Sequence, residues 1–174
     1  MEVMTQQPGN AAATLSWGVK QSLRAYVTLA QGAIEASEGA VRAADGGFTF
    51  PAAPGDGLTL GADGRPEGVG RFVGEARFEA HGGMLKIFLA DPRLEIGPAG
   101  AILSVADTRA RDRRVELARL DLAAATIGDD GAWVIPASAA RNGWQVLGDH
   151  YPASTPLDPV HLKLAPTEPV SGSA

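Results

Sequence analysis

The chain has 174 residues and a mass of 17.9 kDa, a length that fits one domain of ordinary size with a substantial core. Hydrophobic residues make up 45% of it and charged residues 20%, which excludes a chain that is disordered throughout. Because 20 Asp and Glu outnumber 15 Lys and Arg, the net charge is -5, and we expect no nucleic-acid partner. With 0 Cys, disulfides, thiolate metal sites and cysteine nucleophiles are excluded.

The two ends of the chain are predicted to be tails around a single domain at 14–164. Residues 1–13 and 165–174 are small, polar and rich in Pro and Ser, so we expect both to be disordered. The first ten residues lack the basic and apolar regions of a secretory signal, and no apolar run approaches the length of a membrane span.

Two segments have the pattern of an amphipathic helix. In residues 14–29, apolar side chains recur at four-residue spacing behind the possible N-caps Thr14 and Ser16. Residues 138–147, with Ser138 as cap, form a shorter candidate.

The remaining apolar segments are short and separated by turn residues, among them 22 Gly and 12 Pro, which favours strands. Within 70–81 small or apolar side chains alternate with charged ones, as expected of an antiparallel strand with one wet face. Gly82-Gly83 then predicts a hairpin turn into 84–90. Further strands are predicted at 32–41, 46–50, 58–60, 93–96, 101–106, 115–122, 133–135 and 160–164. The expected fold class is therefore mainly β: an antiparallel sandwich or barrel-like sheet with one or two short helices.

Several motifs have a simpler interpretation than a functional site. The glycine-rich stretch 68–74 leads into a strand, not into a helix that could hold a phosphate, so a nucleotide loop is not favoured. The basic residues in 109–114 are diluted by acidic neighbours and fit a solvated loop. His150 and His161 lack a supporting metal-ligand spacing.

Three other side chains, Ser22, Tyr26 and His81, are candidates for a site because of their neighbours. Tyr26 follows Ser22 by four residues on the predicted helix, so both emerge from one face beside Val19. From this spacing alone, a tyrosine packed in the core is the favoured interpretation of Tyr26. His81 ends a strand beside two glycines, where a flat ligand could approach closely, although a surface histidine fits equally well.

The chain resembles the HtaA-type domain, a haem-binding module of bacterial haem-uptake proteins. The first motif is Leu15-Ser-Trp-Gly-Val-Lys-Gln-Ser-Leu-Arg-Ala-Tyr-Val27. The later ones follow in the family's order: Phe48-Thr-Phe-Pro51, Phe78-Glu-Ala-His-Gly-Gly-Met-Leu85, Leu89-Ala-Asp-Pro-Arg-Leu94 and Tyr151-Pro-Ala-Ser-Thr-Pro-Leu-Asp-Pro-Val160. Together they cover roughly residues 15–164.

The resemblance implies a ferric haem b held between the first helix and the sheet. It assigns Tyr26 as the axial iron ligand, His81 as the hydrogen-bond partner of that tyrosine, and Ser22 to a haem propionate. Val19, His150 and Tyr151 are expected to contact the haem as well. His150 stands where the family commonly has an aromatic residue, so it could pack on the porphyrin edge or approach the iron from the open side. Leu23 replaces a phenylalanine that is usual in the family.

The implied chemistry is coherent. A free phenol has a pKa of about 10, so coordination to ferric iron, a hard Lewis acid, is what makes its proton leave. A histidine that donates to the phenolate fixes the ring and shares the charge on the oxygen.

The resemblance implies a haem carrier without enzymatic activity, which takes haem from a donor protein and passes it on at the cell surface or outside the cell. A cytoplasmic location stays open. Two alternatives also stay open: an interaction or adhesion module that has kept the fold without the ligand, and a haem-degrading or peroxidatic enzyme with His150 as the distal group.

Overall fold

A computed structural model describes residues 13–44, 46–53, 58–60, 65–98, 100–106, 113–129, 131–141 and 152–164. Antiparallel strands dominate these residues, and one α-helix, α1 (Gln21–Leu29), accompanies them. The predicted fold class is therefore confirmed. Within the described ranges, no helix has the length and apolar character that crossing a membrane requires.

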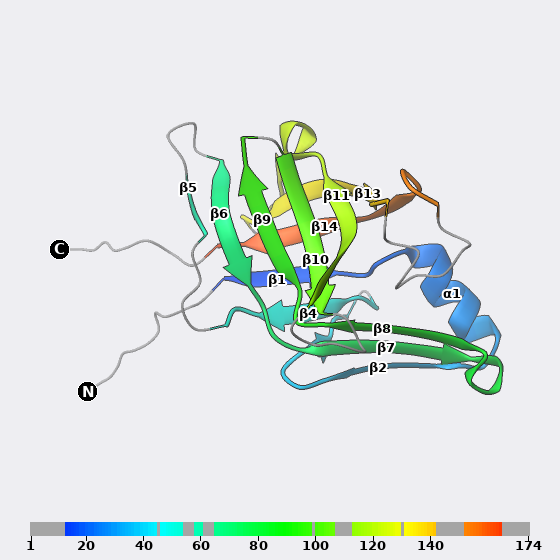
Figure 1. Ribbon diagram of the computed structural model, residues 1–174. Coiled ribbons are helices and arrows are strands. Elements are labelled where there is room, and N and C mark those ends of the chain that lie inside the picture. Colours follow the sequence, from blue (N-terminus) through cyan, green and yellow to red (C-terminus); the bar gives the residue numbers. More distant parts are fainter. Residues whose placement is uncertain are drawn as a thin grey trace, which may run out of the picture.

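The larger sheet has 11 strands among the described residues. Ten follow one path, and β12 (Thr126–Ile127) pairs with β13 off that path. The order is β3 (Val41–Arg42), β4 (Phe48–Pro51), β1 (Thr14–Trp17), β14 (Pro156–Lys163), β13 (Trp133–Ala139), β11 (Arg114–Leu120), β10 (Gly100–Ala106), β9 (Arg93–Gly97), β6 (Pro66–Arg71) and β5 (Thr59–Leu60). Figure 1 shows the strong twist of this sheet, with β1 and β14 running across the direction of β9 and β10.

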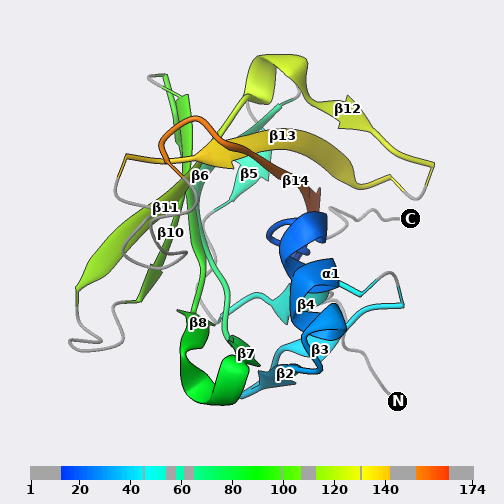
Figure 2. The same ribbon diagram turned by 90° about the vertical axis from the view of Figure 1, so that its right-hand side faces the viewer.

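The smaller sheet consists of β2 (Ala33–Ser37), β7 (Glu75–Ala80) and β8 (Leu85–Ala90), in the order β2-β7-β8. The predicted hairpin is confirmed: β7 and β8 are antiparallel, and the short 3₁₀ turn η1 (His81–Gly83) joins them. Ala76, Phe78 and Ala80 are buried while Arg77 is exposed, as the alternation predicted. Figures 1 and 2 both show α1 beside the η1 end of this hairpin.

The core lies between the two sheets and the helix. Phe48 of β4 and Phe78 of β7 are both fully buried, and their rings meet edge to face with centroids 5.6 Å apart. Leu23 and Val27 are the buried residues of α1 and belong to the same hydrophobic cluster. The inner face of the helix is thus anchored, which leaves its outer face to solvent.

Both helix predictions need correction. Residues 14–17 form strand β1, because Leu15 and Trp17 are buried in alternation and pair with β4 and β14. The helix begins only at Gln21, so neither Thr14 nor Ser16 caps it. Ser138 belongs to β13 and pairs with Arg119 of β11, so it caps no helix. The rest of that second candidate, residues 142–147, lies outside the described part of the chain.

Several strand boundaries also differ from the prediction. The segment 32–41 is divided into β2 and β3, and 70–81 is divided at Gly74 into β6 and β7. The strand predicted at 115–122 is β11, which ends at Leu120, before the 3₁₀ turn η2 (Leu122–Ala124). The glycine-rich stretch is mostly strand β6 and leads into β7.

Candidate functional site

Tyr26 stands on the outer face of α1. Its side chain is 50% exposed, whereas Val27 next to it is fully buried. The interpretation of Tyr26 as a core residue is therefore wrong: four-residue spacing defines a helix face, but not whether that face meets the core. Ser22, one turn earlier, is also exposed, so the two side chains share this face as predicted.

His81 is held at the end of β7 by an unusual backbone. It has a φ of +56°, and Gly82 and Gly83 follow with φ of +66° and +95°. Only glycine adopts such angles freely, so the glycine pair lets three successive residues turn left-handed. This turn leaves the His81 side chain exposed.

The fold brings Tyr26 and His81 together. Tyr26 Oη and His81 Nε2 lie 2.5 Å apart, within hydrogen-bond distance, and the ring planes are inclined by 58°. The hydroxyl donates to Nε2 when that nitrogen carries no proton. A protonated Nε2 donates instead, to a phenolate oxygen.

A close contact at Gly32 sets the position of the helix relative to β7. Gly32 N donates to Val27 O at the end of α1, and a Cβ at Gly32 would collide with the backbone oxygen of Glu79. Glu79 lies two residues before His81 and pairs with Ala33 in β2. The end of α1 therefore lies directly against the strand that carries His81.

Large apolar side chains are exposed on the same two elements. Leu29, at the end of α1, is 84% exposed, and Met84, which follows η1, is 90% exposed. A polar pair on segments that also expose large apolar residues fits a flat, largely apolar ligand with a polar or metal centre.

The other predicted residues are placed differently. Val19 is 1% exposed, so it lies in the core in this structure, and its φ of +69° is strained for a β-branched residue. Val19 stays a predicted ligand contact. His150 and Tyr151 lie outside the described residues.

Within the described ranges, no group of three or more His, Asp or Glu could hold a metal ion. The site thus offers one hard oxygen donor, Tyr26 Oη, with a nitrogen that supports it.

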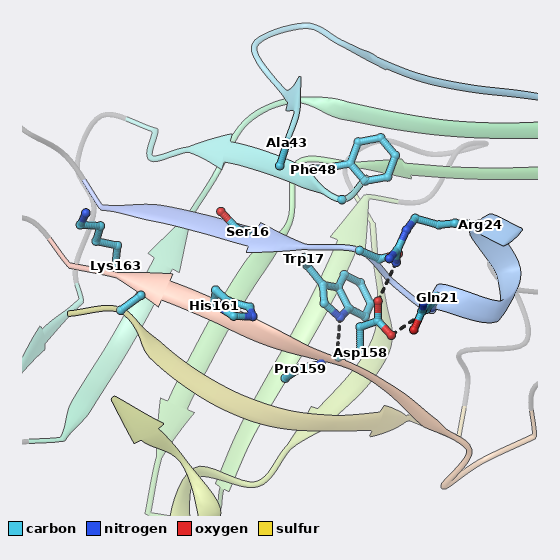
Figure 3. Close-up of a pocket in the computed structure, with 13 residues that line it drawn as sticks. Ser16, Trp17, Gln21, Arg24, Ala43, Phe48, Asp158, Pro159, His161 and Lys163 are labelled. Carbon is cyan, nitrogen blue, oxygen red and sulfur yellow. Dashed lines mark hydrogen bonds and ion pairs between the residues drawn. The ribbon is translucent and has the colours of Figure 1, made fainter. Parts of the chain in front are cut away.

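A separate cavity of about 560 Å³ lies over β1, β4 and β14 and extends to the first turn of α1 (Figure 3). Asp158 on β14 forms an ion pair with Arg24 there, with Oδ2 and Nη1 2.6 Å apart, and accepts from Gln21 N at 3.0 Å. His161 also lines this cavity and is exposed. Asp158 is not among the residues predicted for a site, because only the folded chain brings residue 158 beside the start of α1.

The comparisons with known proteins agree with this architecture. The sequence model of the family described as Htaa matches residues 12–163. The N-terminal domain of HtaA from Corynebacterium glutamicum has a TM-score of 0.66 at 22% identity, over 90% of this chain and 97% of that one. For the C-terminal domain of the same protein the TM-score is 0.64 at 22% identity, over 86% and 93%.

A third structure, described as heme binding protein HtaB from Corynebacterium glutamicum, has a TM-score of 0.59 at 18% identity and covers 86% of this chain and 91% of its own. At these identities the likeness shows a common fold. No curated protein sequence matches the chain.

Proposed function

Because the chain belongs to the HtaA family, we propose that it binds ferric haem b through Tyr26 and passes it on without enzymatic turnover. The observation that carries the proposal is the half-exposed Tyr26, whose Oη lies 2.5 Å from His81 Nε2. The similar structure described as a heme binding protein supports it.

The described residues fit haem as the cargo. The iron supplies a hard Lewis acid, for which a phenolate oxygen is a suitable ligand. Leu29 and Met84 offer exposed apolar surface on the segments that carry Tyr26 and His81, and Ser22 offers a hydroxyl on the same helix face as Tyr26 to a propionate. Burial of about 400 Å² of porphyrin contributes about 10 kcal/mol before ordering costs, so contacts other than Tyr26 also hold the ligand.

His81 would act by holding the phenol oxygen and by managing its proton. With an unprotonated Nε2, His81 would accept the Tyr26 proton when the phenol oxygen ligates iron, and the new N–H would donate back to that oxygen. The hydrogen bond fixes the ring in the ligating orientation, as second-shell groups generally do.

An absorbance titration with ferric haem tests the proposal. We expect a saturable one-to-one Soret shift with the charge-transfer bands of a phenolate ligand, and we expect Tyr26→Phe to lose those bands while it retains weaker binding. Of the 2 Tyr in the chain, the other is Tyr151, so loss of the bands in Tyr151→Phe alone would show that the ligand is assigned to the wrong residue. His150→Ala tests in the same way whether His150 approaches the iron.

If the wild type gives only the spectrum of free haem, the proposal fails and the interaction-module alternative replaces it. Sustained turnover of peroxide or haem that His150→Ala abolishes would instead establish an enzyme.

We further propose that the domain works at the cell surface or outside the cell, with a haem-donor protein as its partner. Fractionation of the native cells tests this location: recovery of the protein in the cytoplasm alone would contradict it.

A further inference from the structure

Asp158 directs all of its polar atoms at the segment that leads into α1. Its backbone N donates to Val19 O at 2.9 Å, and its backbone O accepts from Trp17 Nε1 at 2.7 Å. Its carboxylate accepts from Gln21 N through Oδ1, at 3.0 Å, and from Arg24 Nη1 through Oδ2, at 2.6 Å. Asp158 of β14 therefore contacts four residues between the end of β1 and the first turn of α1, and Figure 3 shows the two contacts at that first turn.

The helix has no cap of its own. Lys20 occupies the N-cap position without a side-chain hydrogen bond to the helix, and the first turn contains no acidic residue. The first N–H groups of a helix lack internal acceptors, and a negative charge beside them is favourable. Asp158, 137 residues away from Gln21 in sequence, supplies both an acceptor and a charge.

Arg24 ties the same carboxylate to the body of the helix. Besides Asp158, Arg24 Nη1 also donates to Gly18 O at 2.8 Å, and a Cβ at Gly18 would collide with this guanidinium. The side chains of Arg24 and Asp158 are only 16% and 26% exposed, so solvent and salt screen the pair less than a surface pair. Lys20 Nζ adds a donor to Pro156 O at 2.8 Å.

The strained turn before the helix depends on the same residue. Val19 has a φ of +69°, which a β-branched residue adopts only when its surroundings impose it. Its carbonyl accepts from Asp158 N, and its side chain is buried. Contacts with β14 thus fix the direction in which the chain passes from β1 into α1.

These contacts matter for Tyr26 because α1 has only 9 residues and buries only Leu23 and Val27. A helix of this length is marginal by itself and takes its orientation from tertiary contacts. Tyr26 lies two residues after Arg24 in the chain and is exposed, and its hydroxyl is hydrogen-bonded to His81. A rotation or fraying of the first turn would move Oη away from His81.

We propose that Asp158 is a positioning residue for Tyr26: as a cap supplied from β14, it holds α1 in the orientation in which Tyr26 Oη meets His81. This inference rests on the proposed function, since its consequence is measured as haem ligation.

Asp121 provides a matched control for Asp158. It is an exposed aspartate that accepts from Ala124 N at 3.3 Å and so caps η2, away from α1. Replacement of either residue by alanine removes one cap and one negative charge. We expect Asp158→Ala to weaken ferric-haem affinity about tenfold, with reduced phenolate charge-transfer bands, while Asp121→Ala binds as the wild type does. Asp158→Asn keeps Oδ1 as an acceptor for Gln21 N, so we expect its haem affinity to lie between those of Asp158→Ala and Asp121→Ala.

A double-mutant cycle with Tyr26→Phe separates positioning from a general loss of fold. Far-UV circular dichroism and thermal unfolding first establish that each variant is folded at the temperature of the titration. If Asp158 acts through Tyr26, then Asp158→Ala changes haem affinity in the wild-type background and has no further effect in the Tyr26→Phe background. Equal losses in both backgrounds, or wild-type affinity and spectrum in folded Asp158→Ala, would overturn the inference.

The two possible failures are distinct. If the wild type gives no Soret shift at all, the proposed function fails; if wild type and Tyr26→Phe behave as proposed but Asp158→Ala matches Asp121→Ala, only the positioning role fails. Should Asp158→Ala not fold, Asp158→Asn takes its place in the cycle and the same outcomes decide.

Discussion

Tyr26 and His81 are 55 residues apart in sequence, yet their Oη and Nε2 atoms lie 2.5 Å apart in the folded chain. Neither residue is buried, so packing around the two side chains does not enforce this contact. It follows from the elements that carry them: α1 is fixed by Val27 in the core and by Gly32 against β7, and β7 ends at Ala80, directly before His81. The fold itself therefore brings the pair together.

If Tyr26 ligates the haem iron as proposed, removal of His81 should speed the release of haem. In His81→Ala the Tyr26 ring loses the partner that fixes its orientation, which weakens haem binding. The phenolate oxygen also stops sharing its charge with an N–H donor, which strengthens the iron–oxygen bond. Loss of a second-shell partner typically costs 10- to 100-fold in metal affinity, so we expect the first effect to dominate, with release about tenfold faster. Stopped-flow transfer to a haem-scavenging protein measures this rate.

His161→Ala is the matched control for that measurement, because His161 is an exposed histidine on β14. Its release rate should equal that of the wild type. Slower release from His81→Ala would show that charge sharing outweighs orientation and would contradict the positioning of the ring by His81.

The sequence predicts the parts of this fold that depend on local alternation. The β7–β8 hairpin is an example: charged and apolar residues alternate along 75–80, and Gly82-Gly83 marks the turn. In residues 14–29, by contrast, Leu15 belongs to the four-residue stripe of a helix and also to the two-residue alternation of β1. Pairing with β4 and β14 decides between these patterns, and no local window contains those strands.

The candidate site, too, is predicted only in part by the sequence. Residue spacing placed Ser22 and Tyr26 on one face, and family resemblance nominated His81. The spacing could not show that this face is exposed, because that depends on Leu23 and Val27 packing between sheets formed by distant segments. The contact of Asp158 with the helix start joins residues 137 and 134 positions apart, which no local pattern encodes.

Phe78 should contribute strongly to stability because it joins the two sheets. Its ring meets that of Phe48 edge to face, and both residues are fully buried. Phe78→Ala removes this contact and leaves a cavity, so we expect the free energy of unfolding to fall by about 3–5 kcal/mol in urea titrations. Phe88→Ala is the comparison. Phe88 lies on β8, which pairs with the strand of Phe78, but it is partly exposed and has the Arg77 guanidinium over its ring. We therefore expect a smaller loss of stability. Equal losses would contradict the role of the Phe48–Phe78 pair.

Arg114 should make stability depend on pH in the alkaline range. Burial lowers the pKa of Arg114 to about 10, with a further contribution from the Arg93 guanidinium, although the side chain donates to Ser104 O and Asp91 O. Between about pH 10 and the higher pKa of the unfolded chain, the unfolded state binds more protons, so the contribution of this group to stability rises with pH.

The measurement compares the unfolding free energy of the wild type with that of Arg114→Gln at about pH 9 and about pH 11. The wild type should gain stability relative to this variant as the pH rises. Arg119→Gln removes an exposed arginine from the same strand, and its difference from the wild type should stay constant. A constant difference for Arg114→Gln as well would contradict the lowered pKa of Arg114.

Gly74 should tolerate no side chain, because it lies where the chain turns from β6 into β7 and so from one sheet to the other (Figure 1). Its φ is +130°, and a Cβ there would lie 2.5 Å from the Cβ of Ala40. Gly74→Ala therefore combines backbone strain of about 1–3 kcal/mol with overpacking of similar size. Gly100→Ala isolates the first term, since Gly100 has a φ of +131° and nothing within 4 Å of an added Cβ. In urea titrations we expect Gly74→Ala to lose about twice as much stability as Gly100→Ala, and equal losses would mean that Ala40 moves aside at no cost.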